Sequence, residues 1–280
     1  VGMSDFGEID RLASIVKPHI GVITNIGVAH MESLGSREGI FQAKMEIAKH
    51  IAGDDELPGT LIYASDSEFL TKERTKGNYD QISVGEKGKD DYIISSVDDF
   101  GMDGIKFTLE HAQKVRQISL PLPGRHNAIN SALAVAVGDL LGISPEEETD
   151  GLAAADLTGN RLKRRENDSI CVIDDTYNAS PDSMKSALRV LEHSRCDGKK
   201  IAILGDMYEL GEDSDRQHFG VGLFAGGLKI DTLIAIGTHA RKICEGADGG
   251  NLQTAYYEKK EDFMPAMHRN VMLLPQPEAP

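Results

Sequence analysis

Two adjacent carboxylates follow an apolar stretch of strand length in "VIDDTYNASPDSM", Val172 to Met184. Asp174 and Asp175 stand where that strand is expected to end, and open α/β sheets bind ligands beyond the carboxyl ends of their strands. The equally good alternative is an acid that caps a turn or a helix. Ser180 or Asp182 can cap the helix that follows, with Pro181 in its first turn. The stretch predicts a ligand site backed by a helix start.

Lys44 places a cation on an apolar stripe. The residues that share this stripe of a predicted helix are Ile40, Phe41, Ile47, Ala48 and Ile51. One interpretation is a lysine whose aliphatic stem lines the core edge while its ammonium reaches solvent. The other is a protected site, where a lowered pKa permits reaction with carbon dioxide or direct contact with phosphate.

Polar residues also stand at two further element ends. His30 and Glu32 follow an apolar strand and can reach a cation or a phosphate if their loop folds inward. Arg125, His126 and Asn127 stand at the entry of a predicted helix, where free backbone N–H groups favour an anion or an acceptor-rich ring. The alternatives are a surface histidine and an exposed first turn.

A second acidic strand end occurs in "ILGDMYELGEDSDRQH", where Asp206 precedes Glu209 and His218. Two such ends in one domain, Asp175 and Asp206, predict a cleft between them. Arg161 belongs to the basic cluster "NRLKRREN" at the expected domain junction. That cluster is either a solvated connection or a phosphate-facing arginine at a hinge.

The phosphate-binding motif G-x-x-x-x-G-K-[ST] does not occur in the sequence. The nearest stretch, "GEKGKDD" from Gly85 to Asp91, has the wrong spacing and flanks. The residues by themselves therefore predict a two-domain α/β protein with an anionic ligand in an interdomain cleft.

The elements that must position these residues begin with an apolar strand at 19–27 and a helix at 35–51. From 60 to 123 the short apolar runs broken by Gly and Asp predict hairpins or a small antiparallel patch. A helix is expected within 124–142, stopped by Gly142, and 144–151 reads as a polar connection.

Beyond this connection, strands and helices alternate. The predicted strands are "ICVIDD", "KKIAILGD", "DTLIAIG" and "LQTAYY", and the predicted helices lie near 183–193, 214–225, 240–245 and 258–269. This order predicts a Rossmann-like parallel α/β domain with right-handed crossovers. The domain boundary is placed near residue 157, which gives domains 1–156 and 157–280.

Composition limits the classes of partner. The 280 residues include 30 Lys and Arg against 45 Asp and Glu, and the net charge of -15 argues against nucleic acid or an anionic membrane surface. Three cysteines suit neither a zinc site nor a disulfide framework, so a reducing cytoplasm is expected. No signal peptide or apolar run of membrane-spanning length occurs. The chain opens with Val1, and we expect an incomplete start.

Seven blocks, in order, resemble the Mur ligases. They are "GMSDFGEI", "VITNIGVAHMESLGSREGI", "AKMEI", "PGRHNAINSALAVA", "NRLK", "VIDDTYNASPDSM" and "ILGDMYELGEDSDRQH". They cover Gly2 to His218, and "IAIGTHA" extends the similarity weakly to Ala240. "LGDMYELG" favours the branch that adds a dipeptide over those that add single amino acids.

The resemblance implies two of the family's three domains, a central ATPase-type α/β domain and a Rossmann-like domain that closes the site. The family's P-loop and one metal-binding Glu are expected upstream of Val1. The last segment, "VMLLPQPEAP", replaces the "VKGSR"-like segment expected there. The resemblance therefore predicts a chain truncated at both ends.

Residue by residue, the resemblance assigns His30 to a magnesium ion and Lys44 to the carbamylated lysine that supports this ion. A carbamate would turn a costly buried cation into a metal-binding anion. Arg161 matches the arginine that reaches the terminal phosphate of ATP.

The remaining assignments concern nucleotide and substrates. Asn127, with His126 beside it, matches the position facing adenine. The segment that holds ribose and phosphates is matched by Asp175, Tyr177 and Asn178, whereas Asp174 stays unassigned. Residues expected near the substrates are Asp206, Glu209 and His218 for the incoming dipeptide and Asn25, Ser4 and Glu8 for the precursor pocket.

The implied activity is an ATP-dependent amide-bond ligase that adds D-Ala-D-Ala to UDP-MurNAc-tripeptide through an acyl phosphate, with Mg²⁺ as cofactor. It belongs to peptidoglycan precursor synthesis in the cytoplasm, and a monomer is expected. The 280 residues by themselves are predicted to be an inactive fragment. Alternatives are a non-catalytic nucleotide-binding module and a folylpolyglutamate synthetase-like ligase, against which "DDTYNASPDSM" and "LGDMYELG" argue.

Overall fold

The computed structural model describes residues 2–86, 88–156, 159–167, 169–249 and 252–271. It divides into two compact units. Unit 1 comprises Val1–Asn178 with His193–Arg195, and unit 2 comprises Ala179–Glu192 with Cys196–Pro280. The boundary predicted near residue 157 falls on residues outside the described part, and the atypical end at 272–280 also lies outside it. The domain boundary therefore stays a prediction.

A six-stranded sheet organises unit 1, in the order β1-β2-β3-β4-β5-β6. Neighbours from β1 to β4 pair in parallel, whereas β4, β5 and β6 form an antiparallel meander. The strands are β1 Ile20–Ile23, β2 Thr60–Ala64, β3 Asp80–Gly85, β4 Tyr92–Asp99, β5 Ile105–His111 and β6 Lys114–Leu120. The strand predicted within 19–27 is confirmed as β1. The antiparallel patch predicted for 60–123 is confirmed only for β4, β5 and β6, because β2 and β3 pair in parallel.

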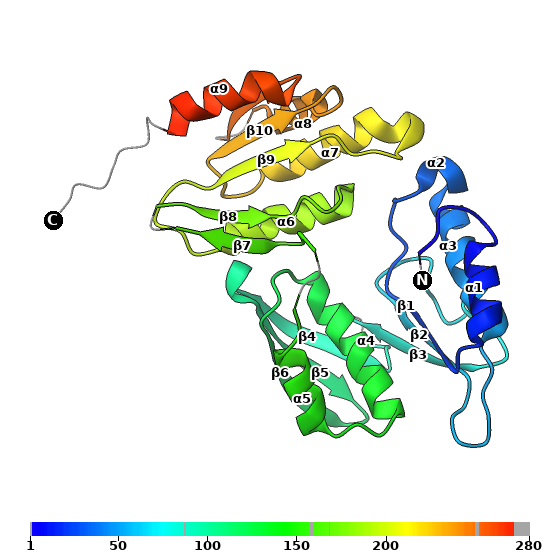
Figure 1. Cartoon of the computed structure of the whole chain (residues 1–280). Coiled ribbons are helices and arrows are strands. Elements are labelled where there is room, and N and C mark those ends of the chain that lie inside the picture. Colours follow the sequence, from blue (N-terminus) through cyan, green and yellow to red (C-terminus); the bar gives the residue numbers. More distant parts are fainter. Residues whose placement is uncertain (1, 87, 157–158, 168, 250–251, 272–280) are drawn as a thin grey trace. The chain divides into compact units, whose positions relative to one another are not determined.

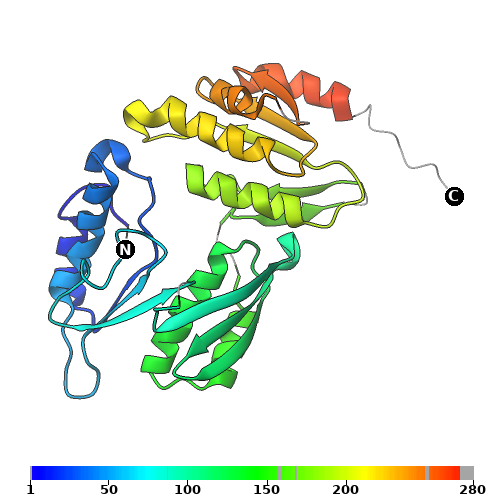
Figure 2. The ribbon, with the colours of Figure 1, turned by 180° about the vertical axis from the view of Figure 1, so that it is seen from behind.

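Helices cover both faces of this sheet (Figures 1 and 2). Strand β2 shows why, since its side chains alternate between two cores. Ile62 packs with α4 on one face, and Leu61 packs with α1 and α3 on the other. The helical segments of unit 1 are α1 Glu8–Val16, α2 Met31–Leu34, α3 Arg37–Met45, α4 His126–Leu140 and α5 Pro145–Ala153, with short 3₁₀ helices at Glu46–His50 and Gly101–Asp103.

Helix α3 begins where the Ser36 hydroxyl accepts a hydrogen bond from the Gly39 N–H at 3.1 Å. The helix predicted to run to residue 51 instead changes at Glu46 into the 3₁₀ helix Glu46–His50. Lys44 thus lies in the last turn of α3, where a cation complements the helix dipole.

The polar stretch predicted to be a connection is helix α5, so that prediction is wrong. Ser144 and Glu147 form a capping box, and Pro145 takes the first helical position. No residue of α5 is fully buried. Instead, Arg116 donates to Glu148 at 2.5 Å and to Asp139 on α4 at 2.6 Å, which docks α5 on the sheet by charge.

The strand predicted from "ICVIDD" does not join a parallel sheet. β8 Cys171–Asp174 pairs antiparallel with β7 Lys163–Glu166 in a separate two-stranded sheet. The turn explains the hairpin, because the Asn167 side chain accepts hydrogen bonds from the N–H groups of Ser169 and Ile170.

Unit 2 holds a three-stranded parallel sheet in the order β11-β10-β9, as expected of a Rossmann-like domain. Its strands are β9 Ile201–Gly205, β10 Thr232–Ile236 and β11 Gln253–Tyr257. The helices of this region are α6 Pro181–His193, α7 Ser214–Gly226, α8 Arg241–Ala247 and α9 Lys260–Val271, with a 3₁₀ helix at Gly211–Asp213. Apart from the first strand, the predicted alternation is confirmed.

Helices α7 and α8 approach each other through glycines. A Cβ atom on Gly222 would collide with the backbone oxygen of Ile243, and one on Gly246 with that of Phe219. Hence two backbones meet where any side chain would separate them.

The three cysteines differ in exposure. Cys171 and Cys196 are exposed, whereas Cys244 on α8 is half-buried and its thiol contacts the Ala255 oxygen at 3.5 Å. Burial raises the pKa of the Cys244 thiol. Among the described residues, no helix combines the length and apolarity that a membrane crossing requires.

Candidate functional site

Lys44 and Asn25 meet at the carboxyl end of β1. Lys44 Nζ donates to the Asn25 backbone oxygen at 2.8 Å and to its side-chain oxygen at 3.2 Å. The side chain of Lys44 crosses a partly buried region, and this burial lowers the pKa of its ammonium. A lysine with a lowered pKa has a larger neutral fraction, which is the form that reacts with carbon dioxide.

Ser4 lies in the turn before α1 and contacts Glu8, the first residue of that helix. The Glu8 carboxylate accepts from the Ser4 N–H at 2.6 Å and the Asp5 N–H at 3.3 Å. These hydrogen bonds, with a smaller contribution from the charge of His30, hold the pKa of Glu8 below its ordinary value. Glu8, Ser4 and His30 thus belong to one neighbourhood.

Glu46 fixes this neighbourhood to the Lys44 helix, and the sequence reasoning did not single it out. Only 7% of Glu46 is exposed, and its two carboxylate oxygens accept from the N–H groups of Gly7 and Asp10 at 2.9–3.1 Å. An anion at the start of α1 complements the helix dipole. An acid inside the apolar run "MEIA" was the available signal.

A magnesium ion would find an incomplete set of protein ligands here. The described residues contain no group of three or more His, Cys, Asp or Glu side chains that could hold a metal ion. His30 has a backbone φ of 64° and precedes α2, and the ammonium of Lys44 cannot ligate a cation. With Lys44 as a carbamate the donors fit Mg²⁺, which binds through few carboxylates together with waters and phosphates.

The start of α4 presents one buried and one exposed polar side chain. Asn127 is 5% exposed, donates from Nδ2 to the Pro123 oxygen at 2.7 Å and accepts from Asn130 Nδ2 at 3.2 Å. His126 is exposed beside it. Asn130 is a second residue absent from the sequence assignments, found only through this bond.

The hairpin region gathers three of the predicted nucleotide residues. The guanidinium carbon of Arg161 lies 4.3 Å from the centroid of the Tyr177 ring, in a cation–π contact. Asp175 accepts from the Leu162 N–H at 3.1 Å. Burial raises the pKa of Asp175, while that hydrogen bond and the charge of Arg161 oppose the rise. Asn178 is exposed.

Asp174, unassigned from the sequence, has a local role. Its Oδ1 accepts from the Thr176 hydroxyl at 2.7 Å and from the Thr176 N–H at 3.2 Å. These bonds lower the pKa of Asp174 and close the turn that presents Asp175.

In unit 2, Asp206 follows β9 and Glu209 lies in an exposed loop with a φ of 60°. Asp206 accepts from the Ala240 N–H at 2.6 Å and from the Thr238 N–H at 3.0 Å, which holds the loop after β10. The expectation that Asp175 and Asp206 end strands of the same sheet is wrong, since Asp175 follows the hairpin strand β8.

His218 is wholly buried on α7. Its Nε2 accepts from the Met207 N–H at 2.9 Å, and its Nδ1 donates to the Ser214 oxygen at 2.7 Å. Both ring nitrogens are therefore engaged within unit 2, and His218 supports the loop that carries Glu209.

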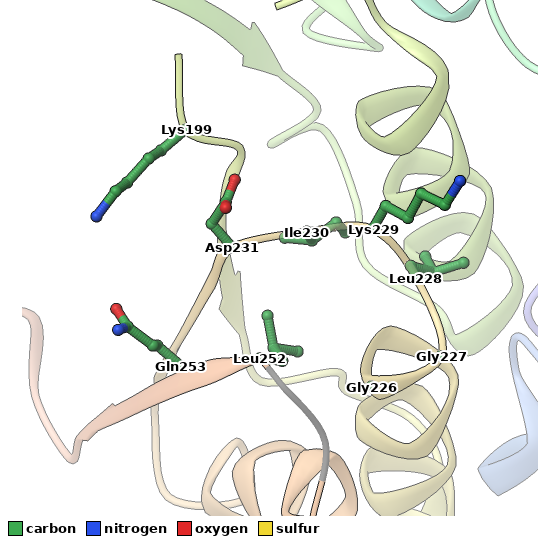
Figure 3. A pocket seen from close by; sticks show the side chains of 9 residues that line it. All are labelled: Lys199, Gly226, Gly227, Leu228, Lys229, Ile230, Asp231, Leu252 and Gln253. Atoms are coloured by element: carbon green, nitrogen blue, oxygen red, sulfur yellow. The ribbon is translucent and has the colours of Figure 1, made fainter. Parts of the chain in front are cut away.

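A concavity of about 470 Å³ lies at the amino ends of the strands of unit 2, between Ile230 and Leu252 (Figure 3). Lys199 and Lys229 lie on opposite sides of the lining residues in this view, and their ammonium groups do not converge. A ligand site needs convergent polar groups, so the carboxyl end near Asp206 is the better candidate.

Comparisons with known proteins identify related domains. The family model "Mur ligase middle domain" matches residues 1–138, and "Mur ligase, glutamate ligase domain" matches residues 160–274. The second match begins before the hairpin β7–β8, which clusters with unit 1 in the structure.

Individual relatives agree with these matches. A UDP-N-acetylmuramoyl-tripeptide--D-alanyl-D-alanine ligase of Bacillus subtilis (strain 168) is 37% identical over 276 residues, 96% of this chain and 58% of the relative. A crystal structure of MurF from Acinetobacter baumannii has a TM-score of 0.87 at 32% identity, covering 97% of this chain and 57% of that one. MurF ligase from Thermotoga maritima in complex with ADP has a TM-score of 0.78 at 25% identity, covering 97% and 60%. The chain thus spans less than two thirds of these relatives.

Proposed function

The chain belongs to the Mur ligase family, and we propose that it takes part in joining D-Ala-D-Ala to UDP-MurNAc-tripeptide at the expense of ATP. The name of the Bacillus subtilis relative supports this substrate pair. The reaction would serve peptidoglycan precursor synthesis in the cytoplasm.

The observation that carries the proposal is the contact of Lys44 with Asn25. A half-buried lysine with a lowered pKa, held at the carboxyl end of a parallel strand, is suited to take up carbon dioxide. The carbamate would carry a negative charge in place of the ammonium, and with His30 it would hold a magnesium ion. That ion would neutralise charge on the phosphates of ATP.

The chemistry has two steps. The terminal carboxylate of the tripeptide attacks the γ-phosphorus of ATP, which forms an acyl phosphate and releases ADP. The free amine of D-Ala-D-Ala then attacks the acyl carbon, loses a proton and expels phosphate. Phosphoryl transfer of this kind depends mainly on positioning and on charge stabilisation.

In this scheme Arg161 neutralises the transferring phosphoryl group, and its stacking on Tyr177 limits the conformations of the guanidinium. Asn127 and His126 face adenine, while Asp175, Tyr177 and Asn178 bind ribose and phosphates. Asn25, Ser4 and Glu8 line the precursor pocket.

The proposed dipeptide residues divide by exposure. Glu209 is exposed and is assigned to the incoming amine, whereas Asp206 and His218 act by holding the loops around it. We therefore propose Asp206 and His218 as positioning residues.

The test compares Lys44→Ala with Lys49→Ala, a change at an exposed lysine of the adjoining 3₁₀ helix that pairs with Asp10. Phosphate release is measured with ATP, UDP-MurNAc-tripeptide and D-Ala-D-Ala, with each omitted in turn. We expect turnover that needs all three substrates, lowered by about 10–100-fold or more in Lys44→Ala and unchanged in Lys49→Ala. Removing a residue that supports a bound metal typically costs about 10–100-fold in metal affinity or activity.

Because the sequence holds no phosphate-binding loop, the 280-residue polypeptide should turn over slowly by itself. The assay is therefore repeated with the part of the Bacillus subtilis relative that this chain does not match. ADP binding that weakens in Asn127→Ala, with no turnover under either condition, would contradict the ligase proposal and favour a nucleotide-binding module.

A further inference from the structure

The loop of residues 24–30, here called the β1–α2 loop, carries Asn25 and His30. Two cations of helix α3 hold it. Arg37 Nη2 donates to the Ile26 oxygen at 3.1 Å, and Lys44 Nζ donates to the Asn25 oxygen at 2.8 Å. Residues seven apart in a helix lie on the same side about two turns from each other. Two consecutive carbonyls are therefore held from one helix face.

Arg37 is itself held on several sides. Its Nη1 donates to Glu68 at 3.1 Å, and its guanidinium carbon lies 4.7 Å from the centroid of the Phe69 ring. A cation in the first turn of a helix opposes the helix dipole, so helix formation does not explain an arginine here. The contacts explain it, because they orient one N–H toward Ile26.

We infer that Arg37 is a positioning residue that fixes the β1–α2 loop and thereby sets the place of Asn25 against Lys44. The positioning of the loop by Arg37 does not depend on the proposed function, whereas its effect on catalysis rests on that proposal. If Lys44 takes up carbon dioxide, its ammonium first loses a proton; the amine nitrogen then bonds to the carbon of CO₂ and releases a second proton, which leaves a carbamate in place of the ammonium. Arg37 then remains as the cation that holds the loop.

Arg74 offers a matched control on the same aromatic ring. Its guanidinium carbon lies 5.1 Å from the Phe69 centroid and 4.4 Å from that of Phe41, and it pairs with Glu38 at 2.6 Å. Its described hydrogen bonds go to Glu38 and Thr71, and none of them reaches the β1–α2 loop. Arg37 and Arg74 thus differ in the loop contact.

The test is hydrogen–deuterium exchange of peptides covering the β1–α2 loop in Arg37→Met and Arg74→Met. Arg37→Met loses one cation–π contact and one ion pair, and Arg74→Met loses two cation–π contacts and one ion pair. We expect loop exchange about tenfold faster or more in Arg37→Met, because the loop loses a hydrogen bond to a charged group. In Arg74→Met the loop should change by less than about twofold.

Equal loop exchange in the two variants, or no change in Arg37→Met, would overturn the inference. If Arg37→Met does not fold, Arg37→Lys is compared with Arg74→Lys under the same criteria. This measurement uses neither ATP nor substrate, so its result is independent of whether the ligase proposal holds.

A second readout reports on Lys44. Protein in ¹³C-labelled bicarbonate should show a carbamate carbon resonance that is lost in Lys44→Ala. The bicarbonate concentration at which this resonance reaches half of its full intensity should shift several-fold in Arg37→Met and stay unchanged in Arg74→Met. A general loss of stability would not produce this difference. A resonance that responds equally to both changes would contradict a positioning role for Arg37.

Discussion

At the residue scale, polar side chains that looked like ligand contacts divide into two kinds. His218, with both ring nitrogens engaged, and Asp174, which closes a turn, hold the backbone. Lys44 and Asp175 instead have pKa values displaced by burial. Perturbed ionisable groups at strand ends are typical of functional sites.

Asp175→Asn tests the burial of that carboxylate. The amide oxygen can still accept from the Leu162 N–H, but no charge is buried. A raised folded-state pKa means that the ionised Asp destabilises the fold at neutral pH, and this penalty fades as pH falls through the folded-state pKa toward the ordinary value of 3.8. We expect the variant to melt above the wild type at pH 7–8, with a difference that shrinks on acidification.

The control for this comparison is Asp197→Asn, at an exposed loop position. Its melting difference from the wild type should stay near zero across the same pH series. A constant advantage of Asp175→Asn at every pH would show that the carboxylate is not penalised by burial.

The residues that could be recognised from the sequence at this scale are those whose surroundings are set by nearby residues in the chain. Lys44 was recognisable because its neighbours at helical spacing are apolar. The role of Glu46 depends on its hydrogen bond with Gly7, 39 residues away in the sequence. Arg37 depends on Glu68, 31 residues away, and on the neighbouring Phe69. No local pattern specifies such pairs, so their roles required the structure.

At the element scale, local signals decided which predictions succeeded. The strands of unit 2 were predictable as short β-branched runs between helices. α5 was missed because Pro145 to Gly151 include no apolar side chains at helical spacing, although the Ser144 and Glu147 spacing of a capping box was present. The hairpin strand β8 was assigned to the wrong sheet because strand pairing depends on a turn at Asn167, and periodicity does not reveal pairing partners.

The glycine contact between α7 and α8 yields a prediction about packing. Gly222→Ala should destabilise unit 2 by about 1–3 kcal/mol, because the added methyl group meets the Ile243 backbone and cannot be accommodated by a side-chain rotation. Gly220→Ala, two residues earlier with nothing within 4 Å of an added Cβ, should be neutral or stabilising by up to about 1 kcal/mol. Urea titration measures both, and equal effects would rule out the close contact as the cause.

At the scale of the whole molecule, each unit has its own hydrophobic interior. Among the described residues, the buried hydrophobic cluster of unit 2 runs from Met184 to Leu252, and Ala179 and Tyr256 pack against it. Unit 1 divides its apolar residues between the two faces of its sheet. The two-domain α/β organisation was predictable because the pattern of apolar residues changes along the chain. Short apolar runs broken by Gly and Asp, over 60–123, are followed later by alternating strand and helix patterns.

We therefore predict that a polypeptide of residues 179–271 folds by itself. Its length of about 90 residues exceeds the minimum at which a single core can support a domain. A cooperative thermal transition and dispersed amide resonances are expected. A broad, non-cooperative melt of this polypeptide, together with a sharp melt of residues 160–271, would instead place the hairpin β7–β8 in the same folding unit.

The half-buried thiol of Cys244 allows the rate at which unit 2 opens to be measured by chemical labelling. A short pulse of maleimide should modify exposed Cys171 and Cys196 at once, while Cys244 reacts only when α8 separates from the strand that carries Ala255. The mass added at this one position, counted against pulse time, would give the rate at which the unit opens without any engineered probe. A substrate that binds unit 2 and stabilises it would be detected because it slows the labelling of Cys244.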